Sequence, residues 1–254
     1  MEQPLFLSVI IPCFDEMANL QKGVLDKVNK YLQKKQFTYE VIIVDDGSTD
    51  GSVNFIEKFI GENKGFSLLK DKHTGKAGAV TAGVLKSTGK IVLFTDMDQA
   101  TPIEELDKLL PYFKEGYDVV IGSRAGRRIG APMTRRIVSH ASILLTQIIV
   151  GIKNISDTQC GFKAFTSPSA KDLFTKLNTL HHGYKEVSGS AVTSGFDVEL
   201  LYLSQSSGYK VKEVPVNWLH VETRRVNIIK DSIMGVVDLL TIRKNIIAGV
   251  YKNL

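Results

Sequence analysis

The chain has 254 residues, 43% of them hydrophobic and 23% charged, so it can bury a substantial core as one large α/β domain or as one domain with an appendage. Its formal charge of +5 permits an anionic partner without distinguishing nucleic acid, lipid phosphate and small phosphorylated substrates. Its 2 cysteines form no Cys/His cluster, which argues against a disulfide framework or a zinc site and favours a reducing cytosol.

No segment has the pattern of a membrane-spanning helix. The N-terminal run MEQPLFLSVII lacks a basic region and a small-residue cleavage site, and it is too short to cross a bilayer. Residues 137–152 form the most apolar later stretch, but polar side chains interrupt it. We therefore expect the N-terminal run to form a first strand, and any membrane contact to be peripheral.

Short β-branched runs follow one another through the first half of the chain, at residues 7–11, 39–45, 90–95 and 118–122. Each precedes a helix-length mixture of polar and apolar residues, which predicts βαβ units and a mostly parallel sheet. Because the runs are nearly continuous in Val, Ile and Leu, helices are expected on both faces of the sheet. Capping and proline-first signals predict helices over 51–62 and 102–115.

The alternation weakens later, where the Gly/Arg-rich stretch GSRAGRRIGAPMTRR leads into an apolar helix candidate at 137–150. We predict an α/β domain over 1–225 and a C-terminal amphipathic helical appendage over 226–254. Apolar residues recur at helical spacing in the appendage, and basic residues lie near its end. Both helical segments can lie in a membrane interface or pack on the protein's own sheet, and the sequence leaves the two readings open.

Two aspartates follow the strand KIVLF in the motif TDMDQATP. Asp96 and Asp98 thus emerge at the carboxyl end of a buried strand, where open α/β sheets place their ligand sites. Residues i and i+2 of an extended segment project to the same side, so the two carboxylates can share one hard divalent cation that also binds diphosphate oxygens. Alternatively, Asp96 ends the strand and Asp98 only makes turn contacts.

Two further motifs end apolar strands near the same edge. In VDDGSTDG, Asp45 and Asp46 can accept hydrogen bonds from a base or a ribose, or the run can be a plain helix cap. In SVIIPCFDE, the strand stops at Pro12 and presents Phe14 and Glu16. Phe14 can stack on a base or lie in the core.

The order and approximate spacing of SVIIPCFDE, VDDGSTDG, HTGKAGAVTAG and TDMDQATP resemble those of the inverting family 2 glycosyltransferases, which have the nucleotide-sugar-binding GT-A fold. The resemblance continues through GSR at 122–124, DTQCGFKAF at 157–165, FDVELL at 196–201 and VPVNW at 214–218. It covers nearly the whole chain, and it is strongest to the dolichyl-phosphate glucosyltransferases and mannosyltransferases, the glucosyltransferases above all. The fold implied is a Rossmann-like, mostly parallel sheet flanked by helices.

The resemblance implies roles for individual positions on the donor side. The positions that would hold the nucleotide-sugar are Pro12, Phe14, Glu16, Asp45, Asp46, Lys76 and Asp96. Asp96 and Asp98 match the pair that binds Mg²⁺ or Mn²⁺. Lys76 can equally be a solvated lysine at a helix start. Gln99 stands one place before the third metal ligand of the mannosyl enzymes, and Ala100 occupies that slot, which favours the glucosyl branch.

The acceptor side is basic, because residues 119–156 contain no Asp or Glu but several arginines. Guanidinium groups suit bidentate phosphate binding. The positions that match the family's lipid-phosphate site are Arg124, Arg135, Ser139 and Arg224. Arg127 and Arg128 fall in a loop that differs between members and can be solvated surface charges. The catalytic residues implied are Asp98, Asp197 and Arg124.

Phosphate chemistry fits such an acceptor, because a phosphate monoester is already an anionic nucleophile at neutral pH and needs little help from a general base. The resemblance therefore implies a metal-dependent hexosyltransferase, peripheral on the cytoplasmic face of a membrane. It would move glucose from UDP-glucose onto a polyprenyl or dolichyl phosphate, with inversion. A GDP-mannose donor, or a soluble glycan or protein acceptor, is the alternative.

Other classes fit less well. No G-x-G-x-x-G motif opens a helix after the first strand, which disfavours a dinucleotide oxidoreductase, and no nucleotidyltransferase loop is found there. The basic loop lacks the aromatic pattern of a nucleic-acid site. A sugar-nucleotide sensor without turnover stays open. The 5 histidines show no metal-ligand spacing, and no role is assigned to them. Residues 181–195 form either a loop beside the site or an inert insertion.

Overall fold

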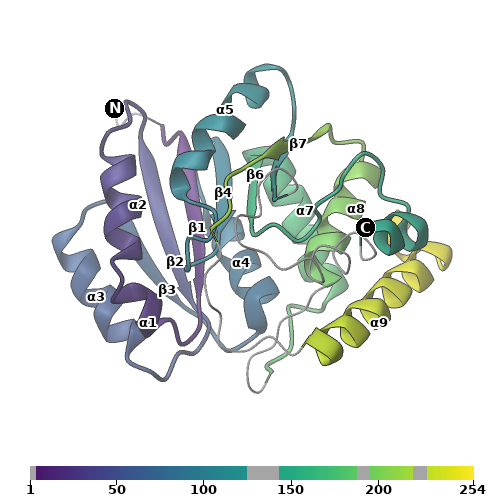
Figure 1. Cartoon of the computed structure of the whole chain (residues 1–254), viewed down its shortest axis with the longest axis horizontal. Helices are drawn as coiled ribbons and strands as arrows, with labels where there is room; N and C mark the ends of the chain where they lie inside the picture. Colours follow the sequence, from purple (N-terminus) through teal and green to yellow (C-terminus); the bar gives the residue numbers. More distant parts are fainter. Residues whose placement is uncertain (1–3, 125–142, 188–194, 220–227) are drawn as a thin grey trace.

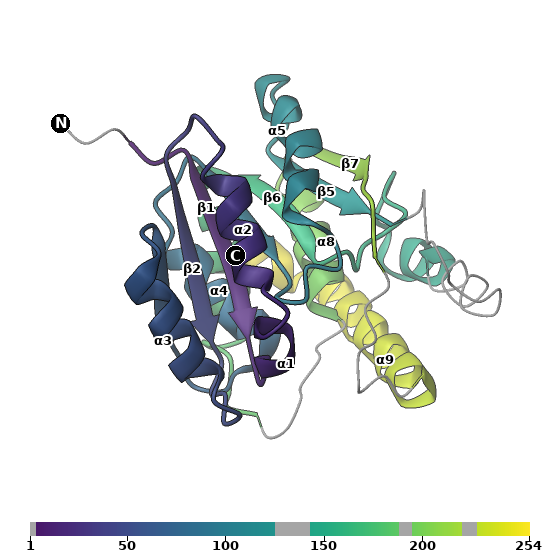
Figure 2. The ribbon, with the colours of Figure 1, turned by 60° about the vertical axis from the view of Figure 1, so that its left-hand side comes forward.

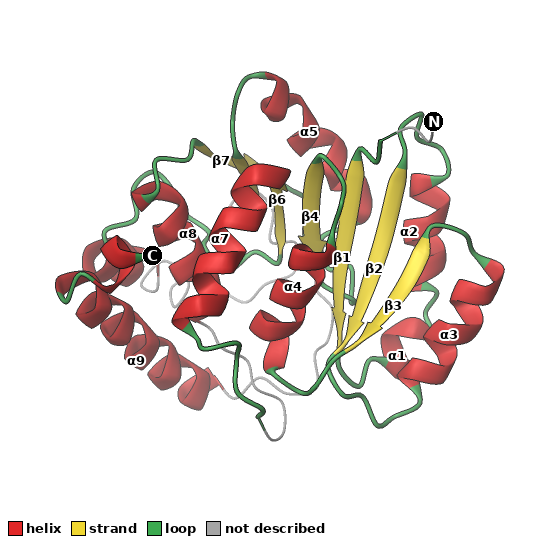
Figure 3. Cartoon of the chain, turned by 180° about the vertical axis from the view of Figure 1, so that it is seen from behind, coloured by secondary structure: helices red, strands yellow, loops and turns green. Residues whose placement is uncertain are grey.

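A computed structural model of the chain describes residues 4–124, 143–187, 195–219 and 228–254. Over these residues the protein is a layered α/β structure, in which helices cover both faces of one 7-stranded sheet (Figure 1). The view from behind shows α4 and α7 lying across the sheet, with α2 and α3 on its other side (Figure 3). The predicted α/β class is confirmed.

The sheet has the order β3-β2-β1-β4-β6-β5-β7, and β6 runs antiparallel to both of its neighbours while the other pairs are parallel. The strands are β1 Leu7–Cys13, β2 Tyr39–Asp45, β3 Phe66–Lys70, β4 Ile91–Thr95, β5 Val119–Ser123, β6 Phe162–Thr166 and β7 Val211–Pro215. The four predicted strands are confirmed as β1, β2, β4 and β5, and β7 covers the start of VPVNW, which the sequence also indicates as a strand, whereas β3 and β6 were not expected.

The helices are α1 Met17–Leu20, α2 Val24–Leu32, α3 Ser52–Glu62, α4 Gly75–Lys86, α5 Leu106–Lys114, α7 Ser167–Leu180, α8 Gly195–Ser206 and α9 Ile228–Ile247, with 3-10 turns η1 Ile103–Glu105 and η2 Val250–Asn253. Residues 143–150 are also helical. The helix predicted over 51–62 is confirmed as α3, and that over 102–115 as η1 and α5. The predicted domain boundary at 225 lies outside the described residues.

Strand side chains alternate between two cores, one on each face of the sheet. Val9 and Ile11 of β1 pack with α2, α3 and α5, whereas Ile10 packs with α4, α7 and α8. This period of two is the reason the central strands are apolar throughout. Packing on the two faces thereby fixes where helices such as α3 and α4 begin, at the carboxyl edge of the parallel strands.

The C-terminal helix α9 has one buried side, where Leu239 and Ile242 join the core beside α8. Apolar side chains on its other side are exposed, including Val237 and Leu240, each 55% exposed. No helix in the described ranges is both long and apolar enough to cross a bilayer.

Helix α4 approaches the sheet closely because Gly83 has no side chain. A Cβ at Gly83 would stand 2.5 Å from Cγ2 of Ile10 and 2.8 Å from Cγ2 of Val44. These contacts come from the neighbouring strands β1 and β2, so the position of α4 depends on this glycine. Since α4 begins at the candidate site, its placement matters for function.

Substituting Gly83→Ala should lower the free energy of unfolding by about 1–3 kcal/mol, because the added methyl group overpacks the core. Urea unfolding followed by circular dichroism measures it. The control is Gly61→Ala on the exposed side of α3, where a Cβ meets nothing within 4 Å. That control should be neutral or stabilise by up to about 1 kcal/mol. Equal stability of the two variants would contradict the packing account.

Candidate active site

The carboxyl ends of three neighbouring parallel strands bring the first three motifs together. Cys13 of β1 lies in register with Asp45 of β2, and β4 is the other neighbour of β1. Phe14, Asp46 and Asp96 each follow one of these strands directly. The sequence therefore placed the donor-side candidates on one edge of the sheet, and the structure shows them there.

Asp46 is buried, and its carboxylate forms hydrogen bonds with the protein's own backbone. Its carboxylate accepts hydrogen bonds from the N–H groups of Thr74 at 2.7 Å and Gly75 at 2.9 Å, the first donors of α4. Asp45 accepts from Gly47 and Ser48 in the same way. Asp46 thus acts as a cap of α4 supplied from another strand, which the sequence did not predict, whereas the expected cap of the following helix is made by Asp50, which accepts the N–H of Ser52 at 3.0 Å. Asp46 ties the start of α4 to β2.

His73 lies between the Phe14 and Asp46 motifs, although the sequence assigned it no role. Its Nδ1 is 2.8 Å from Oδ2 of Asp46, and its ring stacks on Phe14 with centroids 4.1 Å apart and an angle of 6° between the planes. Gly47, at φ 83°, allows this approach, since a Cβ there would come within 3.2 Å of the histidine Cβ. In the sequence, only the position of His73 just before the GKAGA loop could have indicated that it lies at this edge.

The carboxylates of Glu16, Asp96 and Asp98 and the ammonium of Lys76 lie near one another at this edge of the sheet. Nζ of Lys76 lies 2.5 Å from Oδ1 of Asp96, which joins the first turn of α4 to the end of β4. Burial alone would lower the pKa of Lys76, but Asp96 and then Asp197 hold it above its usual value. Burial and the carboxylates of Asp98 and Asp96 raise the pKa of Glu16, and burial and Asp96 raise that of Asp98. Such an acidic group attracts a cation.

The acidic charge of Glu16, Asp96 and Asp98 suits a divalent cation, although their side chains are not arranged around one point. In the described part of the chain, no set of three His, Cys, Asp or Glu side chains has the arrangement of a metal site. Instead, the ammonium of Lys76 forms an ion pair with Asp96 and supplies the positive charge there. Asp98 accepts the N–H of Ala100 at 2.9 Å, as the turn reading expected, and keeps its second oxygen for another partner. Among the described residues, none donates a hydrogen bond to the buried Oε1 of Gln99.

The next charges along the edge form two buried ion pairs. Nζ of Lys163 lies 2.5 Å from Oδ1 of Asp197. Arg124 makes a two-pronged pair with Asp157, through Nε at 2.7 Å and Nη2 at 2.7 Å. Burial alone would lower the pKa of Arg124, but the nearby carboxylate of Asp157 keeps it above its usual value. Conversely, burial alone would raise the pKa of Asp157, but the guanidinium of Arg124 keeps it below its usual value. Asp157, Lys163 and their pairings were not anticipated from the sequence.

Part of the predicted acceptor site cannot be placed. Arg135, Ser139 and Arg224 lie outside the described residues, as do Arg127 and Arg128. Pro12, at the end of β1, is half-buried beside the edge. The placed candidates therefore cover the donor side and the Arg124 end of the acceptor side.

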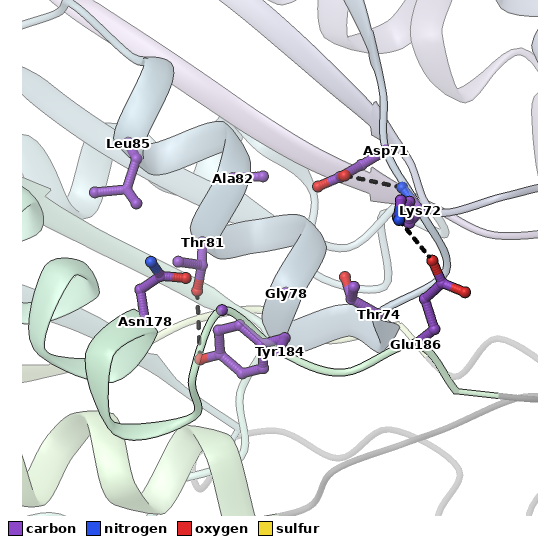
Figure 4. Close-up of a pocket in the computed structure, with 11 residues that line it drawn as sticks. Asp71, Lys72, Thr74, Gly78, Thr81, Ala82, Leu85, Asn178, Tyr184 and Glu186 are labelled. Atoms are coloured by element: carbon purple, nitrogen blue, oxygen red, sulfur yellow. Dashed lines mark hydrogen bonds and ion pairs between the residues drawn. The ribbon is translucent and has the colours of Figure 1, made fainter.

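A cavity of about 400 Å³ lies alongside α4 (Figure 4). Its outer wall is the segment after α7, held by the ion pair of Lys72 with Glu186 at 3.0 Å and by the hydroxyls of Tyr184 and Thr81 at 3.4 Å. None of the predicted site residues lines it. The cavity therefore adjoins the candidate active site through Thr74, whose N–H Asp46 accepts, but shares none of the predicted residues.

Comparison with known families identifies the chain. The family described as glycosyl transferase family 2 matches residues 8–174. A dolichyl-phosphate beta-glucosyltransferase of Dictyostelium discoideum is 32% identical over 98% of this chain and 77% of its own length. This protein is a family 2 glycosyltransferase. The enzymes of the same name from Saccharomyces cerevisiae and Homo sapiens are 31% and 30% identical, over 99% and 97% of this chain and 78% and 77% of their lengths.

Solved glycosyltransferase structures share the fold. Glucosyl-3-phosphoglycerate synthase of Mycobacterium tuberculosis has a TM-score of 0.63 at 16% identity, covering 94% of this chain and 80% of that one. A mannosyltransferase of Pyrobaculum calidifontis, in complex with GDP-Man and Mn²⁺, has a TM-score of 0.56 at 18% identity, covering 89% of this chain and 59% of that one. The GT-A fold expected from the motifs is thus confirmed.

Substituting Gly161→Ala should reduce glycosyl transfer by about 10- to 100-fold, because a Cβ there would overlap the Asp96 carboxylate and displace it from the edge. Steady-state turnover is the measurement, with the melting temperature as a check on folding. Gly61→Ala is again the matched control. Wild-type turnover in Gly161→Ala would show that Asp96 need not occupy its present position.

Proposed function

We propose that this glycosyltransferase moves glucose from UDP-glucose onto a polyprenyl or dolichyl phosphate, with inversion at the anomeric carbon, using Mg²⁺ or Mn²⁺. The observation that carries the proposal is the near full-length similarity to three dolichyl-phosphate beta-glucosyltransferases. The charges along the sheet edge support it, since carboxylates lie at one end of the site and Arg124 at the other.

On the donor side, the stacked rings of Phe14 and His73 offer a flat surface for the base. Asp45 and Asp46 hold the two loops that shape this surface, through their backbone hydrogen bonds. Asp96 and Asp98 would hold the cation, which when bound neutralises charge on the departing diphosphate. Lys76 adds a second positive group at the start of α4, where the helix dipole also favours phosphate.

On the acceptor side, a phosphate oxygen of the lipid forms the new bond to the anomeric carbon. The bond from that carbon to the diphosphate breaks, and its electron pair leaves with UDP. No general base is required, because the phosphate monoester is already anionic. Arg124 keeps its charge at every relevant pH and is oriented by Asp157, so it can position the nucleophile. By the family resemblance, Arg135, Ser139 and Arg224 complete this site.

A membrane surface is the natural location of such an acceptor. Exposed apolar side chains gather on residues 143–150, where Leu144 is 58% and Ile148 69% exposed, and on α9. Both segments lie at the end of the molecule opposite α3 (Figure 1; Figure 2). Basic Arg243 and Lys244 are exposed on α9 and suit anionic headgroups. We place the enzyme peripherally, on the cytoplasmic face.

The direct test is transfer of radiolabelled glucose from UDP-glucose to polyprenyl phosphate in detergent, following label into the organic phase. We expect extraction that requires Mg²⁺ or Mn²⁺ and is abolished by EDTA. Asp98→Ala should lower the rate by about 10²- to 10³-fold, because charge on the leaving group is then less well stabilised. Asp26→Ala, at an exposed position of α2, is the control.

Three outcomes would each correct the proposal. Equal transfer from GDP-mannose would contradict the assignment of UDP-glucose as the donor and favour the mannosyl alternative. Label that stays in the aqueous phase would move the acceptor to a soluble glycan or protein. Full turnover in Asp98→Ala would remove the metal assignment.

A second prediction concerns the membrane. Replacing Val237 and Leu240 by Glu should weaken binding to anionic phospholipid vesicles by about 100-fold or more, since each buried aliphatic side chain is worth about 1.5–3 kcal/mol and the variant loses two of them. Cosedimentation with vesicles measures it. Asn54→Glu adds a negative charge to an exposed position of α3, at the other end of the molecule, and should bind like the wild type. Unchanged binding of the α9 variant would show that α9 does not face the bilayer.

A further inference from the structure

Lys163 carries a buried charge to which the proposed reaction assigns no role. Within the described ranges it is the one lysine or arginine with no exposed surface. Its Nζ lies 2.5 Å from Oδ1 of Asp197 and 2.6 Å from the carbonyl oxygen of Cys160, and 5.4 Å from the centre of the Phe94 ring. An ammonium in such surroundings is costly unless it is paired, and here it is paired.

Stability alone does not call for a lysine at this position. Lys163 is in the central strand β6, and its neighbours Phe162 and Ala164 point to the opposite core. Its side chain therefore shares a face with Phe94 and Phe165, where an aliphatic residue of the same size would fit. Replacing a buried ion pair by hydrophobic residues of similar volume is often neutral or stabilising. The pair is more readily explained by what it does for Asp197.

Asp197 is in the first turn of α8, is only 8% exposed, and lies between the donor and acceptor sides. Its charge contributes to the raised pKa of Lys76, which contacts Asp96, and to that of Arg124. An Asp197 that could rotate freely would be able to form an ion pair with either cation. It would then withdraw positive charge from the phosphate of the donor or of the acceptor.

We propose that Lys163 is a positioning residue of the transfer reaction: its buried ammonium holds the Asp197 carboxylate in one orientation and keeps it from pairing with Lys76 or Arg124. This inference rests on the proposed function, because it takes the two cations to face the two phosphates. Lys163 itself touches neither substrate. Its effect passes entirely through Asp197.

A double-mutant cycle tests that dependence. Lys163→Met should lower kcat by about 10- to 100-fold, as expected for misplaced charge at a reaction centre, and Asp197→Asn should lower it as well. KM for UDP-glucose should change by a smaller factor than kcat, because the Phe14 and Asp46 region that would hold the nucleoside is untouched and only the charge at the phosphates is altered. The double variant Lys163→Met/Asp197→Asn should be no slower than Asp197→Asn alone.

Lys171→Met is the matched control. Lys171 of α7 also places its ammonium among protein oxygens, donating to the carbonyls of Val84, Leu85 and Ser87 at 2.8, 2.7 and 2.8 Å at the far end of α4. This variant should melt at a lower temperature and keep the wild-type kcat. It separates the loss of a structural lysine from the loss of a positioning one.

The cycle decides the proposal even if Lys163→Met fails to fold, because the double variant leaves no buried charge unpaired. A double variant that is tenfold or more slower than Asp197→Asn would overturn the proposal, as would wild-type kcat in Lys163→Met. Rates are compared among variants, using whichever nucleotide sugar the wild type turns over. Failure of the glucosyl assignment therefore shows in the wild type, and failure of this inference shows only in the cycle.

Discussion

Mutual repulsion among the carboxylates at the carboxyl edge of the sheet is the constraint on which the rest of the site depends. The parallel arrangement of β1 and β4 brings Glu16, Asp96 and Asp98 together, and burial makes their charges more costly. Lys76 offsets part of this cost through its ion pair with Asp96. The cap that Asp46 provides for α4 makes that pair possible, because it fixes the turn from which Lys76 projects.

Charges of opposite sign then alternate across the site. Lys76 is paired with Asp96, Asp197 with Lys163, and Asp157 with Arg124, so each of these cations has a defined neighbour. Glu213 of β7 fixes the backbone next to the last of these pairs, since it accepts the N–H of Asp157 at 2.8 Å. Such preorganisation suits a reaction in which both nucleophile and leaving group are phosphates, because the protein's contribution is then mainly electrostatic and positional.

The sequence predicted the strands that carry the motifs, since β1, β2, β4 and β5 are apolar runs followed by turn residues. It did not reveal β3 or β6, and in β6 the charged Lys163 makes a short strand resemble a solvent-facing segment. The pairing of Lys163 with Asp197 spans 34 residues and depends on the antiparallel course of β6. No local pattern could show it. The contacts of His73 could not be predicted for the same reason, because its partners Phe14 and Asp46 directly follow β1 and β2, far from it in the sequence.

Binding of Mn²⁺, followed by the paramagnetic resonance signal of the free ion, tests the central claim that this edge is a cation site. The account predicts one ion per chain, loss of binding in Asp96→Asn and Asp98→Asn, and tighter binding in Lys76→Met, where no ammonium competes for Asp96. Saturable binding that is unchanged in all three variants, or no binding with UDP present, would contradict it.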